Sequence, residues 1–149
     1  METRLDEKSY IEQRVQDQIN WLEGKSAFNQ RWYKLLKRIV LLSSLLIPFL
    51  TGFLEENLFW LKVTIGALGV IIAFCEGLLS LNKYHDNWLQ YRSTTEDLKR
   101  EQFLYKTNAA KYAELDNPFQ KFVIEIESIL SKENAQWKEN WSDTEAGKP

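Results

Sequence analysis

The chain has 149 residues, a formal net charge of -2 at pH 7 and a single cysteine, Cys75. This length leaves room for one domain, and without a basic excess there is no reason to expect a nucleic-acid partner. One cysteine excludes an intramolecular disulfide and a cysteine-based metal cage.

Charge and hydrophobicity are segregated along the chain. Residues 35–81 are mostly apolar, whereas both flanks are rich in Glu, Lys, Gln and Asn. The chain has only three prolines and six glycines, and alternating strand-like runs are absent. This combination predicts helix throughout.

Residues 1–34 are predicted to form a cytoplasmic amphipathic helix. Between Ser9 and Trp32, apolar residues recur every three to four positions opposite a polar face, the pattern of a helix that buries one stripe. The recurring residues are Ile11, Val15, Ile19 and Leu22. Because this polar segment precedes the first apolar run, we expect no cleavable signal peptide, and the first hydrophobic helix should direct its own insertion.

Two hydrophobic runs, 35–54 and 58–81, follow one another and have the length that a bilayer core requires. Three residues separate them, and a link that short forces the two helices to be antiparallel neighbours. The sequence therefore predicts an all-α membrane protein with a transmembrane hairpin at 35–81. The alternative is a soluble protein that buries a helical hairpin, which the aromatic and basic flanks of both runs argue against.

Basic residues cluster on one side of this hairpin, preceding the first run or following the second. They are Arg31, Lys34, Lys37, Arg38, Lys83 and Arg92. The connecting turn offers only Glu55 and Glu56, with Lys62 slightly inside the second span. Cytoplasmic loops are the ones enriched in Lys and Arg. We therefore expect a multi-pass protein with both termini in the cytoplasm and the turn outside.

Residues 82–141 are predicted to be a cytoplasmic helical segment. The second span should continue as a helix toward Lys106, followed by a break at 108–118 and a last helix that ends near Trp141. The last helix carries an apolar stripe suited to a bundle or a coiled coil. Its members are Phe119, Phe122, Val123, Ile126, Ile129, Leu130, Trp137 and Trp141. Residues 142–149 are expected to be a disordered tail.

Glu76 lies inside the second span, where an ionisable group is costly and counts as a functional candidate. At about 100° per residue it lies beside a narrow face of small residues, which allow helix backbones to approach closely. These residues are Gly66, Gly69, Ala73, Gly77 and Ser80. The bulky residues and Cys75 on the opposite face are expected to meet lipid. Glu76 and the small residues then line a pore or set its selectivity, or Glu76 forms a structural ion pair with Arg38, since Arg38 or Lys37 enters the membrane from the same side.

Other candidate residues are few. Glu55 and Glu56, at the outer tip, would form an acidic mouth in a symmetric oligomer, although lone loop carboxylates are more often simply solvated. His85 has no partner at metal-ligand spacing, and Cys75 has no nearby base. Because there is also no phosphate-binding glycine loop, we expect no enzyme, no metal and no cofactor.

The layout is similar to that of a family of short bacterial proteins with a domain of unknown function, related to the SLATT superfamily (SMODS- and SLOG-associating two-transmembrane effectors). The matching residues are Trp21-Leu22, Trp32-Tyr33, the hairpin, Trp88, the segment Tyr91-Arg92-Ser93-Thr94-Thr95-Glu96, the segment 98–105, Phe119, Glu127 and Trp137. The resemblance implies a pore-forming effector of bacterial conflict systems that a nucleotide-sensing partner activates.

These observations lead us to expect an oligomeric, cation-permeable pore or channel subunit in a bacterial inner (plasma) membrane. The second spans would line its axis, and the cytoplasmic helices would assemble or gate it. The expected partners are the lipid bilayer, further copies of the chain and a cytoplasmic regulator. The alternative is a non-conducting anchor or scaffold that recruits a cytoplasmic partner, and a third reading is a subunit of a larger transporter.

Overall fold

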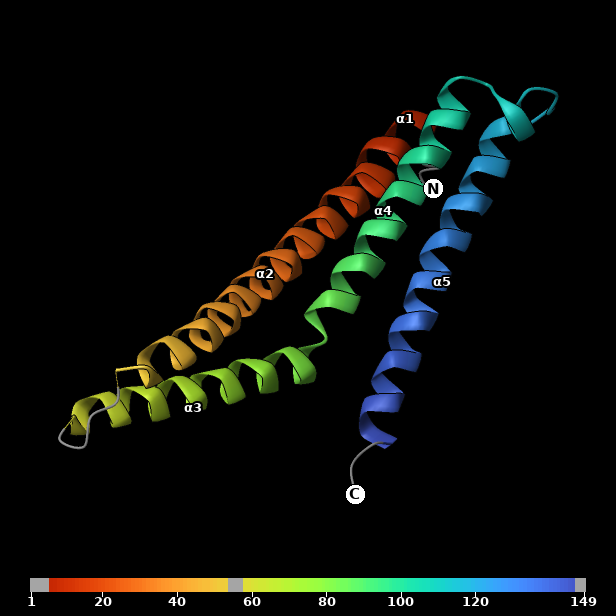
Figure 1. The fold of residues 1–149 in the computed structure, drawn as a ribbon. Helices are drawn as coiled ribbons and strands as arrows, with labels where there is room; N and C mark the ends of the chain where they lie inside the picture. The colour runs from red at the N-terminus through yellow and green to blue at the C-terminus, as the bar shows by residue number, and fades with distance from the viewer. Residues whose placement is uncertain (1–5, 54–57, 147–149) are drawn as a thin grey trace. The chain divides into compact units, whose positions relative to one another are not determined.

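The computed structural model describes residues 6–53 and 58–146, and the side chains among them as far as residue 135. Within these residues the chain is helical and contains no strand, which confirms the predicted all-α class. Figure 1 shows the helices in chain order. They are α1 (Glu7–Ser9), the π-helix η1 (Tyr10–Gln16), α2 (Asp17–Thr51), α3 (Phe59–Asn82), α4 (Tyr84–Lys106), the 3-10 helix η2 (Ala110–Tyr112) and α5 (Pro118–Ala146).

The chain divides into two compact units. Residues 1–26 and 89–149 form one, here named the bundle unit, and residues 27–88 form the other, named the hairpin unit. The long helices α2 and α4 each contribute residues to both units. The last helix runs on to Ala146, past the end that the sequence predicted for it near Trp141.

The bundle unit is built around one apolar core. Val15, Ile19 and Leu22, spaced by three to four residues, are each at most 1% exposed, as the apolar stripe of the first segment predicts. The stripe of α5 faces the same core, with Phe122 and Ile126 fully buried. The remaining core members come from η1, α4, η2 and α5, and they are Tyr10, Leu98, Tyr112 and Leu130. The apolar stripes of helices far apart in the sequence therefore pack together into one core.

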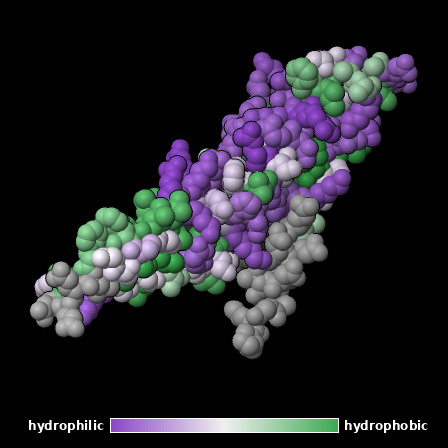
Figure 2. Space-filling model, in the orientation of Figure 1, coloured by the Kyte–Doolittle hydropathy of each residue, from purple (hydrophilic) through white to green (hydrophobic). Residues whose placement is uncertain are grey.

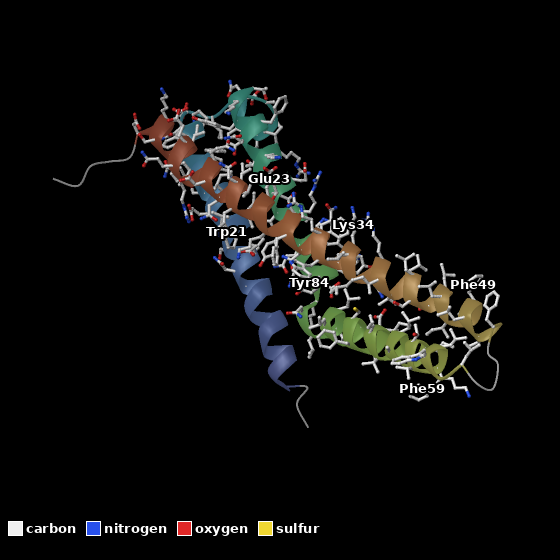
Figure 3. The ribbon with its side chains drawn as sticks, turned by 90° about the vertical axis from the view of Figure 1, so that its left-hand side faces the viewer. Trp21, Glu23, Lys34, Phe49, Phe59 and Tyr84 are labelled. Atoms are coloured by element: carbon white, nitrogen blue, oxygen red, sulfur yellow. The ribbon has the colours of Figure 1, made fainter. Side chains whose placement is uncertain are left out.

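The hairpin unit contains the second part of α2, the whole of α3 and the start of α4, and α2 and α3 run antiparallel beside each other (Figure 3). Here the sequence prediction was wrong in one respect, because α3 does not continue into α4. Lys83 adopts the left-handed conformation, with φ 45° and ψ 39°, and breaks the helix. Two asparagine amides satisfy carbonyls at this break: Asn82 donates to Leu78 O at 3.0 Å and Asn87 to Asn82 O at 3.1 Å. These bonds offset part of the cost, about 1–2 kcal/mol, of a left-handed residue that is not glycine.

Large apolar side chains cover the outside of the hairpin unit, where Figure 2 shows mainly hydrophobic colours. Among the described residues, the range Phe59–Lys106, which comprises α3 and α4, contains one window long and apolar enough to cross a membrane, and 6% of that window is buried. A core helix of a soluble protein would be mostly buried, so this exposure indicates membrane association. The first run does not pass the same test, because its described helix ends at Thr51 and its uncharged part begins only after Arg38.

Candidate functional site

An ion pair joins the two helices of the hairpin unit. Lys37 Nζ lies 2.9 Å from Glu76 Oε1 and 3.3 Å from Oε2, so the ammonium contacts both carboxylate oxygens. Both side chains remain almost half exposed. The cation on Glu76 is therefore Lys37 rather than Arg38, because consecutive helical residues differ by about 100° in direction and only one of them faces α3.

The face of α3 that carries Cys75, rather than the face of Gly69 and Gly77, lines the seam between α2 and α3. Leu36 and Ser43 are buried on α2 and Cys75 on α3, each 5% exposed. Other seam residues of α3 are partly buried, and they are Leu61, Ile65, Leu68, Ile72 and Leu79. The expectation that the face of Cys75 meets lipid is therefore wrong for this chain. Its branched side chains fill the space beside α2, which burying glycines would leave empty.

The small-residue face consequently lies on the outside of the hairpin. Its five members are all exposed, and they are Gly66, Gly69, Ala73, Gly77 and Ser80. A Cβ atom added at Gly66, Gly69 or Gly77 would meet no atom within 4 Å. Glu76 borders this face, because it lies between the seam and the small residues around the helix. No contact within the described chain requires these glycines.

The outer acidic mouth predicted at Glu55 and Glu56 lies outside the described residues and stays a prediction. In the part of the chain that the structure describes, no group of three or more His, Cys, Asp or Glu side chains could hold a metal ion.

Aromatic rings gather at the basic end of the hairpin unit, where α3 gives way to α4. The Tyr33 ring lies 4.9 Å from His85 and 6.4 Å from Trp88 between centroids, and His85 lies 5.8 Å from Trp88. Lys34 Nζ is placed 5.7 Å from the Trp88 centroid, within the range of a cation–π contact. The sequence showed aromatic flanks on both hydrophobic runs. It did not show that the His85 ring would contact both Tyr33 and Trp88.

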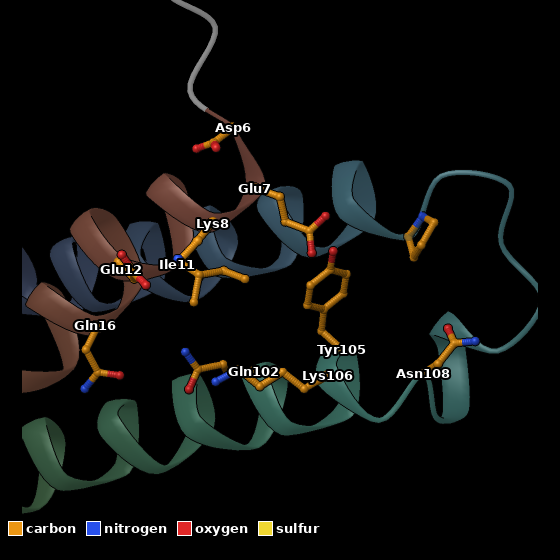
Figure 4. Close-up of a pocket in the computed structure, with 11 residues that line it drawn as sticks. Asp6, Glu7, Lys8, Ile11, Glu12, Gln16, Gln102, Tyr105, Lys106 and Asn108 are labelled. Carbon is orange, nitrogen blue, oxygen red and sulfur yellow. The ribbon is translucent and has the colours of Figure 1, made fainter.

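The bundle unit contains a cleft of about 830 Å³ between η1 and the end of α4 (Figure 4). The Nε2 atom of Gln102 is buried at this cleft without a hydrogen-bond partner among the described residues. Burial and hydrogen bonding to Glu7 raise the pKa of Tyr105, so its hydroxyl stays protonated. Ile11, on η1, lines the other side. Sequence periodicity did not reveal the cleft, because a π-helix interrupts the usual 3.6-residue repeat.

Two charged networks hold the helices of the bundle unit together. Tyr112 donates its hydroxyl proton to Glu101, and Lys111 bridges Glu101 and Glu125 at 3.0 Å each. Glu101 is 6% exposed, and burial followed by its hydrogen bond raises the pKa of Tyr112. Such a buried carboxylate is tolerated because it is paired.

In the second network Glu127 accepts two hydrogen bonds from Arg14, at 3.1 and 3.0 Å, and one from Tyr10 at 3.0 Å. Glu127 was singled out only through the family resemblance. Neither composition nor spacing indicated its partners, which lie more than a hundred residues away in the chain.

A family model described as "Protein of unknown function (DUF4231)" matches residues 17–120, most of the chain. The chain belongs to the DUF4231 family. No curated protein and no solved structure matches it. The DUF4231 segment takes in α2, α3, α4 and η2, and so includes the Lys37–Glu76 pair, the small-residue face and the aromatic cluster. Most of α5 lies beyond it, and the three members of the second network, Tyr10, Arg14 and Glu127, all lie outside the matched residues.

Proposed function

We propose that this DUF4231 protein is a subunit of a homo-oligomeric, cation-permeable pore in a bacterial inner membrane. Both α2 and α3 cross the bilayer as a hairpin, both termini are cytoplasmic, and the bundle unit assembles or gates the pore. The observation that carries the proposal is the small-residue face of α3, exposed on a helix that is itself apolar and exposed.

The surface of α2 supports a second crossing. Beyond Arg38 its outer positions are large and apolar, with Leu42, Leu45 and Phe49 about 60% exposed. Residues 39–51 alone give about 20 Å of helix. Arg38 extends the usable length, because its long cationic side chain reaches along the helix to the headgroups while its stem stays in hydrocarbon.

The small-residue face supports self-association. Lipid tails are as apolar as leucine, so helices associate in a bilayer through close packing at small residues rather than through burial of apolar area. Gly69, Ala73 and Gly77 are spaced by four and present such a surface to a second copy. A single hairpin encloses no aqueous path, so conduction requires this assembly.

Glu76 gives the assembly its ion preference. Contacts across the small-residue face bring the neighbouring carboxylates of several copies toward one axis, and a ring of carboxylates favours cations over anions. The similarity to the SLATT superfamily supports the same function and adds a cytoplasmic regulator that acts on the bundle unit.

The Lys37–Glu76 pair favours a second candidate, a non-conducting anchor whose bundle unit recruits a cytoplasmic partner. A carboxylate that an ammonium neutralises within one hairpin serves the hairpin's own structure and requires no ion path.

Currents across planar bilayers distinguish the two candidates. We expect cation-selective currents from the reconstituted wild-type protein and a smaller preference for cations in Glu76→Gln, because glutamine keeps the shape but removes the charge. Glu96→Gln is the matched control, since Glu96 is exposed on α4 and should leave selectivity unchanged. Unchanged selectivity in Glu76→Gln would refute the role of this residue, and the absence of wild-type current would leave the anchor as the function.

A further inference from the structure

Three cations form a ridge along α2 in the hairpin unit. Arg31, Lys34 and Arg38 are spaced by three and four residues, which places them on one face of the helix, and all three are exposed. They are named here the basic ridge. Over seven residues the ridge extends about 10 Å along the helix axis.

Within the part of the chain that the structure describes, the basic ridge is not neutralised. Among the described residues no carboxylate forms an ion pair with any of its members. The hairpin unit has two described carboxylates. Glu76 forms an ion pair with Lys37, and Asp86 Oδ1 lies 3.4 Å from His85 Nδ1. Lys34 does contact the Trp88 ring, but a cation–π contact holds the ammonium in place without cancelling its charge.

The same face of α2 becomes apolar directly beyond the ridge. Leu42, Leu45 and Phe49 continue the spacing of Arg31, Lys34 and Arg38, and they are 60%, 61% and 63% exposed. From Arg38 to Phe49 the helix rises about 16 Å, close to half of a hydrocarbon core about 30 Å thick. One helix face thus presents cations at headgroup depth and an apolar strip as long as an acyl chain in one leaflet.

We propose that the basic ridge binds the phosphate groups of anionic phospholipids, whose acyl chains lie along Leu42, Leu45 and Phe49. Zwitterionic lipids fit this surface less well, because their choline or ethanolamine group brings a positive charge to a site already holding three. This inference rests on the proposed membrane hairpin, but it requires neither a pore nor self-assembly.

The test measures which lipids stay bound to the protein. Protein reconstituted in equal parts of phosphatidylcholine and phosphatidylglycerol is extracted in mild detergent, and retained lipids are counted by native mass spectrometry. Each basic residue near an anionic surface contributes about fivefold. We therefore expect wild-type protein to retain phosphatidylglycerol at least fivefold over phosphatidylcholine, and the triple variant Arg31→Gln, Lys34→Gln, Arg38→Gln to retain both equally.

Two controls separate the ridge from charge in general. Arg100→Gln, Lys106→Gln and Lys132→Gln together remove three exposed cations from the bundle unit and should leave the lipid ratio unchanged. Arg31→Lys with Arg38→Lys keeps the charge and should keep most of the preference. Equal retention of both lipids by the wild type, or the same loss in the bundle-unit variant, would overturn the inference.

An alkaline carbonate wash of the same vesicles distinguishes failure of this inference from failure of the proposed function. Wild-type protein that stays in the vesicles but retains both lipids equally would refute the ridge alone. Release of wild-type protein by the wash would refute the membrane hairpin and the ridge together.

Discussion

Two glutamates on α5 illustrate how surroundings alone decide the contribution of a residue. Glu127 accepts hydrogen bonds from Arg14 and Tyr10, and the Arg14 bond is the main cause that holds the pKa of its carboxyl below the usual value. Glu133 is 9% exposed and pairs with no cation among the described residues, and burial raises the pKa of its carboxyl. The first carboxylate stabilises the fold when ionised, and the second when protonated.

Substitution of Glu133 by Gln should therefore stabilise the bundle unit at neutral pH. The raised pKa means that Glu133 contributes most below about pH 4.5, its value in the unfolded chain, and that this contribution is lost as the pH rises through the folded value. Gln has no charge to desolvate, so we expect Tm at pH 7 to rise by about 2–4 °C, the shift that about 1 kcal/mol gives in a chain of this size. Thermal melts followed by circular dichroism at pH 4 and pH 7 measure it.

Glu127→Gln is the matched control for this prediction, because its effect on stability at neutral pH should be the opposite one. The contribution of Glu127 is present above the unfolded pKa and lost as the pH falls through the lowered folded value, so this variant should lose stability at pH 7 and approach wild type in acid. The loss should stay below about 1 kcal/mol, because both partners of the Arg14 pair are 44% exposed. A Glu133→Gln variant less stable than wild type at pH 7 would contradict the assignment.

At the scale of elements, periodicity predicted which residues share a face of each helix, but it did not always predict which face packs against the neighbouring helix. The core stripe of Val15, Ile19 and Leu22 was correctly predicted, because it is the one apolar face of an otherwise polar helix. In α3 every face is apolar or small, so the pattern could not decide whether the Gly69 face or the Cys75 face packs on α2. The Cys75 face packs on α2 because its larger side chains fill the space between the two helices. That fit depends on both helices together and cannot be derived from the pattern of α3 alone.

Two other local features left no signal in the sequence. The break after α3 falls at Lys83, where neither glycine nor proline marks a helix end, and two side-chain hydrogen bonds beside it come from the amides of Asn82 and Asn87. The π-helix η1 was likewise predicted as ordinary helix. The sequence predicted Arg38 as the partner of Glu76, and the structure has the neighbouring residue Lys37 there. Adjacent residues of a helix point in directions about 100° apart, and the sequence alone did not show which of the two faces α3.

Substitution of Gly69 or Gly77 by Leu should weaken self-assembly and leave the single chain intact. A side chain at either position enters open space within the chain, so the hairpin loses no contact, but it would separate the backbones of two copies. We expect a shift of the oligomer toward smaller species in detergent, measured by light scattering during size-exclusion chromatography.

Ala67→Leu is the control for that shift, because Ala67 is also exposed on α3 but lies off the small-residue face. Oligomers of wild-type size for both glycine variants, or an equal shift in Ala67→Leu, would show that self-assembly does not depend on the small-residue face.

The stripe of α5 permits an equally direct test of the bundle unit. Ile126 is fully buried and Leu130 is 8% exposed, so Ile126→Glu with Leu130→Lys places two charges in the apolar core. Burying polar or charged groups without full hydrogen bonding costs several kcal/mol, and we expect the cooperative melt of this unit to be lost. Ile124→Glu is the control, because Ile124 is 56% exposed and should tolerate the charge. Wild-type melting of the double variant would mean that α5 does not pack through this stripe in solution.

At the scale of the whole molecule, segregation of charge sets the expected topology. The hairpin unit carries four cations before or at the start of its first apolar run and Lys83 just after the second, whereas Glu55 and Glu56 stand between the runs. Basic residues beside a span are retained on the cytoplasmic side. A hairpin in which both ends are basic and the turn is acidic satisfies this rule in one orientation only, with the turn outside.

Labelling of single cysteines in intact cells tests this orientation. In a Cys75→Ser background, a cysteine at Asn57 should react with a membrane-impermeant maleimide before lysis, because the turn faces outward. A cysteine at Ser93, exposed on α4, should react only after lysis, because the bundle unit follows the basic end of the hairpin. Protection of Asn57→Cys with labelling of Ser93→Cys would reverse the topology. Equal protection of both before lysis, with full labelling afterwards, would instead place the hairpin on the inner side without crossing. That result would refute the second span, because a chain that crosses twice has to expose its turn.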